Sequence, residues 1–379
     1  MKLEQRRWTE ATGWMPETSG ALGASAQLVL IFGGRAFLSE QKWFEDIKQA
    51  YPDAHIFGCS TAGEICGTQV TDEALVTTAV HFDNTQVQGA HIKLRDAEDS
   101  FHAGERLALS LDKNGLAHVL VLSDGLNVNG TDLVQGLVKH LPPGITVTGG
   151  LAGDGARFEQ TFVCLDSLPE AGTIAVLGFY GTRLTVGYGS LGGWDPFGPE
   201  RLITRAKGNV LYELDGQSAL ALYKQYLGEH AAHLPASGLL FPLCLRTKAG
   251  EIGVVRTILA VNEAEHSLTF AGDVPEGAYA RLMKANFERL IDGAIGAAQT
   301  SYEAIGATSP DLALLISCVG RKLVLKQRIE EEVEGVRDIL GEHTVLTGFY
   351  SYGEICPAAP QANCELHNQT MTITTFSER

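Results

Sequence analysis

Two stretches of the chain place glycines, hydroxyl groups and a carboxylate in the same order. Residues 58–67 read Gly-Cys-Ser-Thr-Ala-Gly-Glu-Ile-Cys-Gly, and residues 348–357 read Gly-Phe-Tyr-Ser-Tyr-Gly-Glu-Ile-Cys-Pro. Each stretch follows a short β-prone run, and its glycines let the backbone bend or approach another group closely. Hydroxyl and carboxylate groups on such a turn can bind a small polar ligand. The repeated motif also predicts two halves with related edges.

Four loops that follow predicted strands hold most of the candidate ligand groups: residues 58–67, 123–131, 149–155 and 348–357. Ligands of open α/β sheets bind outside the carboxyl ends of strands, so we expect a small, polar, glycine-rich pocket there. The candidate ligand-binding residues are Ser60, Thr61, Glu64, Asp124, Asn127, Asn129, Gly149, Gly150, Asp154, Tyr350, Tyr352 and Glu354. Turns, loop caps and acceptors for backbone N–H groups are simpler roles for the same residue types, and they stay open.

Catalytic motifs do not fit these loops. Residues 149–153 lack the G-x-G-x-x-G spacing, and no stretch matches a phosphate-binding G-x-x-x-x-G-K-[ST] loop. Cys59 follows a predicted strand, but the G-x-S-x-G spacing of a nucleophile elbow is absent. As a nucleophile, Cys59 would need a depressed thiol pKa and a histidine base from elsewhere. We therefore expect a protein that is not an enzyme, with a Cys59-dependent enzyme as the weakest alternative.

Histidines and cysteines offer few metal ligands. His230 and His233 are three residues apart without a third ligand nearby, which favours a solvated helix end. His367 shares strand parity with Met371, so its side chain is expected to face apolar surroundings. It is either a hydrogen-bonded core histidine or an axial ligand of haem iron. Cys356 could offer a thiolate instead, although the proline after it is explained more simply as the end of the loop.

Length and composition are those of a globular protein. The chain has 379 residues, of which 45% are hydrophobic, and this length favours two domains or three. It has 29 basic and 45 acidic residues, and the resulting net charge of −16 disfavours nucleic acid and anionic membranes as partners. Seven cysteines without a C-x-x-C pair favour a reducing compartment. Because neither a signal peptide nor a membrane-spanning run is recognised, we expect a cytoplasmic protein without membrane insertion.

Helical and β-prone segments alternate along both halves of the chain. The apolar run 27–32 suits a strand covered on both faces. Residues 74–82 and 87–94 predict a β-hairpin, and a second hairpin is expected around residues 207–209. Further expected segments are helices over 219–227, 278–298 and 323–340, strands over 312–316 and 344–347, and a closing strand over 364–376. This alternation predicts a two-lobed α/β fold with mixed β-sheets flanked by helices.

Four motifs in order resemble the FIST family, which comprises bacterial sensory domains with N-terminal and C-terminal FIST halves. These motifs are residues 58–64, 149–154, 348–354 and 367–370. The resemblance extends from about residue 27 to residue 376 and implies small-ligand sensing in signal transduction. It divides the chain into an N-terminal arm (1–26), a FIST N-terminal domain (27–220) and a FIST C-terminal domain (221–379).

The resemblance also implies a ligand and a partner. With no output domain expected after the second half, the chain is similar to the free-standing FIST proteins that bind haem, sense nitric oxide and regulate a separate histidine kinase. We therefore expect a haem-based nitric oxide sensor that acts in two-component signalling and biofilm control. His367 is the expected iron ligand, and a homo-oligomer is compatible with this role. The alternative is a receptor for a small amino-acid-like metabolite, whose ammonium group would bind Asp124, Asp154 and Glu354.

Overall fold

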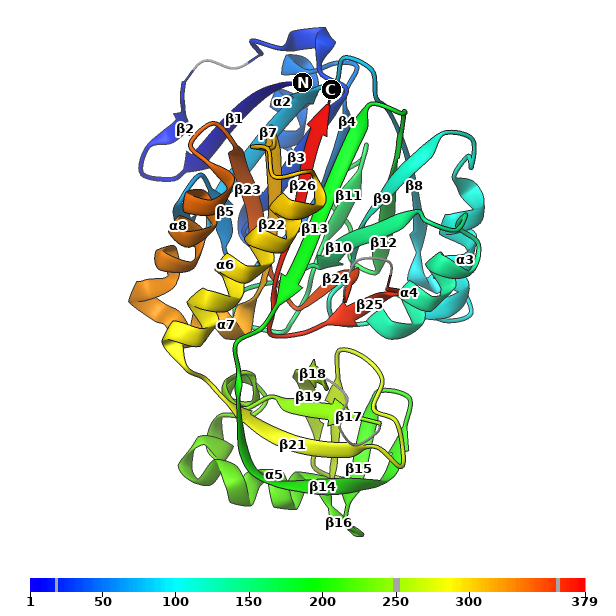
Figure 1. Ribbon diagram of the computed structural model, residues 1–379, viewed down its shortest axis with the longest axis vertical. Helices are drawn as coiled ribbons and strands as arrows, with labels where there is room; N and C mark the ends of the chain where they lie inside the picture. Colours follow the sequence, from blue (N-terminus) through cyan, green and yellow to red (C-terminus); the bar gives the residue numbers. More distant parts are fainter. Residues whose placement is uncertain (18–19, 248–252, 359–361, 379) are drawn as a thin grey trace.

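The computed structural model describes residues 1–17, 20–247, 253–358 and 362–378, which form a large body and a small domain (Figure 1). The small domain comprises strands β14 to β21 with helix α5, and the segments before and after it form the large body. Both chain termini lie at the end of the large body that is remote from the small domain (Figure 1). The expected class, α/β with mixed sheets flanked by helices, is confirmed.

The large body is built from three similar units. Each unit has two parallel strands joined by a helix, then a short strand, then a strand antiparallel to the first. The first unit contains β3 (Leu28–Gly33), α2 (Lys42–Ala50), β4 (His55–Ser60), β5 (Glu64–Cys66) and β7 (Leu75–His81). The second contains β9 (Leu116–Ser123), α4 (Gly130–Lys139), β10 (Thr146–Leu151), β11 (Val163–Leu165) and β12 (Thr173–Tyr180). The third contains β22 (Leu312–Cys318), α8 (Ile329–Leu340), β23 (Val345–Ser351), β24 (Gly353–Pro357) and β26 (Met371–Glu378).

The three units exchange their short strands in a cycle. Strand β5 of the first unit pairs with β23 of the third, β24 of the third pairs with β10 of the second, and β11 of the second pairs with β4 of the first. Each six-stranded sheet of the large body therefore contains a strand from another unit. The two motifs seen in the sequence occupy two of three related positions, and residues 149–154 occupy the third.

Strand β3 shows why these apolar runs form central strands. All six of its residues are buried. Leu28, Leu30 and Phe32 face a core that lies between the three sheets, whereas the alternate residues Val29 and Ile31 pack in a second cluster with side chains of α2. A strand with apolar neighbours on both faces needs apolar residues at every position. The expectation of a strand covered on both faces is confirmed.

The core between the sheets joins all three units. Phe57 of the first unit, Leu120 and Leu177 of the second, and Ile316 and Phe349 of the third belong to the same buried cluster. The rings of Phe32 and Phe349 stack with their centroids 4.8 Å apart. Because this core contains side chains from residues more than 300 positions apart, the large body forms one packing unit.

Helices cover the outer faces of the sheets, and further strands extend their edges (Figure 1). Helix α3 (Ser100–Ser110) packs beside α4, and α6 (Phe287–Ala304) packs beside α8. The edge and flanking strands are β1 (Lys2–Thr9), β2 (Gly13–Met15), β6 (Gln69–Thr71), β8 (Gln86–Lys93), β13 (Leu184–Leu191) and β25 (Cys364–His367). No helix in the described part of the chain is long and apolar enough to cross a membrane.

The small domain is an antiparallel sheet with its own apolar core. Its elements are β14 (Asp195–Lys207), β15 (Val210–Leu214), β16 (Gln217–Ser218), α5 (Ala219–Leu227), β17 (Leu243–Arg246), β18 (Val254–Arg256), β19 (Ile258–Asn262), β20 (Ser267–Phe270) and β21 (Tyr279–Lys284). The hairpin around residues 207–209 and the helix over 219–227 are confirmed. The domain contacts the large body where the parallel strands end, through the loop after β9 and through α7 (Val319–Leu325), which follows β22.

Several expected elements are wrong. Strands β7 and β8 do not form a hairpin, because β7 pairs with β1 and β3 whereas β8 pairs with β12 in another sheet. Residues 279–284 form β21, and α6 begins only at residue 287, where the Asn286 side chain accepts a hydrogen bond from Arg289 N. The helix expected over 323–340 is divided, because Lys326 has φ 51° and ends α7. The closing strand is likewise interrupted at Gln369, which has φ 65°.

Candidate ligand site between the large body and the small domain

The three signature loops (residues 58–67, 149–155 and 348–357) begin at closely packed glycines. A Cβ atom at Gly58 would lie 2.0 Å from Ile31 O, and one at Gly348 would lie 1.8 Å from Leu315 O. The equivalent distance from Gly149 to Val121 O is 1.9 Å, and a Cβ at Gly150 would lie 2.8 Å from Cγ2 of Ile316. Gly149 and Gly150 therefore permit strand packing, and their predicted ligand role has no support in this geometry.

The glutamates of the first and third loops bind the protein itself. Thr61 Oγ1 donates to Glu64 Oε1 at 2.5 Å, and Glu64 Oε2 accepts the N–H of Ala74 at 3.0 Å. In the third unit, Ser351 Oγ donates to Glu354 Oε1 at 2.6 Å, and Glu354 Oε2 accepts the N–H of Thr370 at 3.1 Å. Burial raises the pKa of both carboxyl groups to about 8. These groups tie each signature loop to the start of the next long strand.

The second loop contains Asp154, whose carboxylate also binds groups of the protein itself. Its carboxylate accepts backbone N–H groups of residues 158, 159 and 160 and pairs with Arg35 at 3.2 Å. The hydroxyl of Tyr352 donates to the same carboxylate, and the Tyr352 ring stacks on Phe158 with centroids 4.5 Å apart. Tyr350 is fully buried and donates to Glu332 at 2.7 Å. Asp154, Tyr350 and Tyr352 therefore lie in the protein interior.

The loop after β9 provides caps. Asp124 accepts the N–H groups of residues 126, 127 and 172, the Asn127 amide and the Thr161 hydroxyl. Asn129 caps α4 and donates to Asp273 Oδ1 of the small domain at 2.7 Å. Ser60 Oγ, from the first loop, accepts the N–H of Phe162 at 2.9 Å. The simpler alternative, loop capping, holds for these side chains.

Only part of the predicted pocket is open. Asp124 and Asn127 line a polar cleft of about 650 Å³ together with Arg35, Glu159 and Gln160. Arg35 already pairs with Asp154 and with Glu159, at 2.8 Å for the latter. The other predicted residues do not line this cleft. The structure thus brings the four loops together, but most of their polar groups form hydrogen bonds within the protein.

The surroundings of His367 are those of a hydrogen-bonded core residue, and its role as an axial haem ligand stays a prediction. Its Nε2 lies 2.9 Å from the carbonyl oxygen of Cys356 and donates a hydrogen bond to it. Burial lowers the pKa of the imidazole to about 4, so the ring is neutral at physiological pH. The three residues before it line a cavity, but His367 does not. The hydrogen-bonded core histidine, the alternative left open by the sequence, describes this geometry.

The burial of the two cysteines gives no support to their alternative roles as a nucleophile or an iron ligand. Cys59 is fully buried, and burial raises the pKa of its thiol well above the usual value instead of depressing it. Cys356 is also fully buried, which likewise opposes a thiolate ligand.

His230 and His233 lie in a short 3₁₀ segment after α5. Within the described residues, no group of three or more His, Cys, Asp or Glu side chains could hold a metal ion.

A second cavity lies between the large body and the small domain. It has a volume of about 290 Å³. Thr131 and Gln135 of α4 and Leu366 of β25 line it from the large body, and Arg256 and Asp273 line it from the small domain. Ligand sites commonly occupy such interfaces between domains.

Arg256 is the unusual group of this cavity. The residue is 7% exposed, and its guanidinium donates to the carbonyl oxygens of Leu366 at 2.9 Å and Asp273 at 3.2 Å. Among the described residues its hydrogen bonds go to backbone carbonyl oxygens, and it forms no salt bridge with a carboxylate. Burial lowers its pKa to about 10, because desolvation disfavours the charged form. A buried cation that is held only by carbonyl groups favours an added anion.

Other charged groups complete the cavity. The carboxylates of Asp273 and Glu365 line it and act on Arg256 at longer range. Arg246 also lines it. Its Nη2 pairs with Glu200 at 2.5 Å, while its buried Nε has no hydrogen-bond partner among the described residues. The arrangement offers a guanidinium for a carboxylate and two carboxylates for an ammonium group.

Sequence reasoning missed Arg256, Asp273 and Glu365. Asp273 follows β20 within Ala-Gly-Asp, which resembles the Gly-Asp of the second signature loop, and this is the only local signal. Arg256 and Glu365 stand in ordinary β-prone surroundings. Their significance depends on which strands face each other across the two domains.

The fold defines a two-domain protein with a cavity at the domain interface. The chain belongs to the FIST family, because residues 27–217 match the FIST N domain and residues 219–357 match the FIST C domain. FIST domains are sensory domains of signal transduction, so a sensory role is the function that this membership indicates.

Known relatives add little on the ligand. The chain is 26% identical over 342 residues to an uncharacterized protein of Methanocaldococcus jannaschii, and the match covers 82% of this chain and 62% of that relative. A cyanuric acid hydrolase from A. caulinodans is similar with a TM-score of 0.41 and 8% identity, covering 100% of this chain and 99% of that one. A chorismatase is similar with a TM-score of 0.37 and 10% identity, covering 99% of this chain and 98% of that one. Neither structural similarity bears on the activity of this chain.

Proposed function

We propose that the protein is a sensor for a small zwitterionic metabolite of the amino-acid type, bound in the cavity between the two domains. The observation that carries this proposal is the buried Arg256 guanidinium, which lines that cavity and, among the described residues, donates to carbonyl oxygens and to no carboxylate. A ligand carboxylate would complete its hydrogen bonds in a desolvated setting, where charged pairs are strong. The ligand ammonium would bind Asp273 or Glu365, in place of Asp124, Asp154 and Glu354.

The proposed ligand would couple the two domains. Arg256 belongs to the small domain but donates to Leu366 O of the large body, and Asp273 belongs to the small domain but accepts from Asn129 of the large body. A ligand held by groups from both sides stabilises the arrangement in which those groups face each other. It shifts the equilibrium between arrangements only by its differential affinity for them.

The two segments that connect the domains could transmit such a change in domain arrangement. Arg321 is fully buried and donates to Gly192 O at 2.7 Å and to Leu290 O at 2.6 Å. These carbonyls lie on the segments by which the chain leaves and re-enters the large body. The guanidinium also pairs with Glu332 at 2.7 Å. One buried ion pair therefore anchors both connections.

The proposed role is not catalytic. Cys364 lines the cavity, but its thiol contacts Val147 O at 3.1 Å and burial raises its pKa well above the usual value. A thiol in this state is a poor nucleophile. Regulation of a partner histidine kinase stays a prediction from the family resemblance, and a phosphotransfer assay with and without the metabolite would test it.

Thermal unfolding with matched ligands tests the proposal. Each amino acid is compared with the amine that lacks its carboxylate and with the acid that lacks its ammonium group. We expect stabilisation by one class of zwitterion and by neither of its analogues, because binding at 100 times Kd contributes about 2.7 kcal/mol. Arg256→Lys keeps the charge but loses the planar fork, and it should abolish the effect.

The control is Arg205→Lys, since Arg205 is an exposed arginine of the same domain that pairs with Glu213. Equal loss of stabilisation in this variant, or no response to any amino acid, would refute the assignment of the cavity. The same preparation tests the haem expectation. A Soret band that shifts with nitric oxide and is absent in His367→Ala would replace the metabolite by haem.

A further inference from the structure

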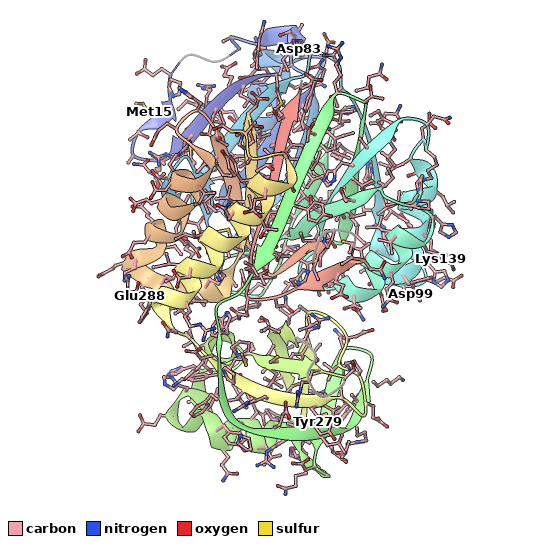
Figure 2. All side chains as sticks on the ribbon, in the orientation of Figure 1. Met15, Asp83, Asp99, Lys139, Tyr279 and Glu288 are labelled. Carbon is pink, nitrogen blue, oxygen red and sulfur yellow. The ribbon has the colours of Figure 1, made fainter. Side chains whose placement is uncertain are left out.

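Three of the four tryptophans of the chain meet at one cavity of the large body. Trp8 of β1, Trp14 of β2 and Trp43 of α2 line a cavity of about 240 Å³ together with Phe37. The cavity lies at the N-terminal hairpin, far from the small domain: Figure 2 labels Met15, the neighbour of Trp14, and Tyr279 of the small domain at opposite ends of the molecule. This cavity is separate from the site of the proposed function.

The aromatic walls are held in place by the fold. Trp8 and Trp14 are directly paired residues of the antiparallel strands β1 and β2, so their side chains project from the same face. The Trp8 and Phe37 rings meet edge to face with centroids 4.7 Å apart. Trp43 is 7% exposed, and its Nε1 donates to Leu38 O at 3.3 Å. Rigid aromatic walls of this kind bind a ligand at little cost in conformational entropy.

The charges around the cavity favour a cation. The exposed residues Glu40 and Asp46 line it, and their carboxylates have no salt bridge or hydrogen bond with the other described residues. Lys42, also exposed, is the single basic residue in the lining, so the carboxylates outnumber it. Aromatic ring faces attract cations, most strongly those of tryptophan.

The same tryptophan already accepts a cation from the protein. The Arg6 guanidinium lies 4.5 Å from the centre of the Trp14 ring. Arg6 lines a neighbouring cavity of about 310 Å³, which shares Trp14 and Asp46 with the tryptophan cavity. The Trp14 ring therefore already contacts one cation of the protein, and Arg6 does not line the tryptophan cavity itself.

We propose that the tryptophan cavity binds a substituted ammonium cation. Methyl groups on the nitrogen contact the rings of Trp8, Trp14 and Trp43, and the carboxylates of Glu40 and Asp46 balance the charge. An ammonium without N–H donors loses little when it leaves water for such a site. The cation can belong to a free metabolite or to a methylated lysine of a partner protein, because both present the same group.

Tryptophan fluorescence of the full chain tests this inference. The probes are choline and its uncharged isostere 3,3-dimethyl-1-butanol, which differ in the positive charge and share the shape. We expect choline to quench and to bind about tenfold more tightly than the isostere, as cation–π contacts in partly desolvated sites predict. Trp194→Phe is the control, since Trp194 lies at the connection to the small domain, where its Nε1 donates to Gln369 O.

The double variant Glu40→Gln with Asp46→Asn should weaken choline binding several-fold and leave thermal stability unchanged, because both carboxylates are exposed and have no partner among the described residues. A trimethyllysine peptide and its unmethylated form distinguish a partner segment from a free metabolite. Binding by either trimethylated probe supports the inference. Equal binding of choline and its isostere, or no binding of any trimethylated probe, would overturn it.

Discussion

The two buried glutamates of the signature loops make the stability of the protein depend on pH. Burial raises the pKa of Glu64 from 4.5 to about 8. A carboxyl group whose pKa is higher in the folded state than in the unfolded state binds protons preferentially in the folded state. Its stabilising contribution is complete below pH 4.5 and is lost as the pH rises through about 8. Glu354 should behave in the same way, since its pKa is also about 8.

The Glu64→Gln variant isolates this effect. Glutamine resembles the protonated glutamic acid: its oxygen can accept the N–H of Ala74, and its amide can donate to Thr61 Oγ1. The pKa change corresponds to about 5 kcal/mol between the two ends of the titration, at about 1.4 kcal/mol for each tenfold change in proton affinity. We therefore expect the variant to gain up to roughly that amount relative to the natural protein between pH 5 and pH 9.

Thermal unfolding from pH 5 to pH 9 provides the measurement. At this chain length the gain corresponds to a difference in Tm that grows by roughly 5–10 °C across the range. Glu10→Gln serves as the control, because Glu10 is exposed and should give a constant difference. A Tm difference for Glu64→Gln that does not change with pH would refute the reasoning, since it would mean that Glu64 is ionised throughout.

Three further predictions concern packing and charge. Arg321→Met should lower the free energy of unfolding, measured in urea, by about 3–5 kcal/mol, because it leaves the buried Glu332 unpaired. Adding Glu332→Met should restore much of the lost stability. A double variant as unstable as Arg321→Met alone would contradict this prediction. Gly348→Ala should prevent folding or lower Tm sharply, because its Cβ would lie 1.8 Å from Leu315 O. The control Gly67→Ala places its Cβ in open space at φ +62° and should cost only about 1–2 kcal/mol of stability. Similar losses of stability in the two variants would refute the steric argument. Cys59 should resist thiol reagents until the protein unfolds, and Cys59→Ala should leave ligand binding unchanged; rapid labelling of the native protein, followed by mass spectrometry, would contradict its burial.

The internal repeat shows where pattern reading stops. The first and third copies of the motif are recognisable because both retain Gly-Glu-Ile-Cys at the same spacing. The second copy is one residue shorter and carries Asp154 in place of the glutamate, so its spacing does not match that of the other two copies. The pairing of the strands establishes that the three copies are equivalent, because β5, β11 and β24 each join a sheet of another unit.

The sequence by itself determined the α/β class, the long central strands and the positions of the glycine-rich signature loops after those strands. These features follow from local causes: continuous apolar runs need cover on both faces, and glycines at fixed spacing allow close backbone approach. Only the tertiary structure decided which polar groups stay free. Nearby backbone N–H groups donate hydrogen bonds to the predicted carboxylates, whereas Arg256, unremarkable in the sequence, has no anionic partner among the described residues. Whether a charge is paired depends on neighbours from other segments of the chain, and spacing along the sequence does not contain that information.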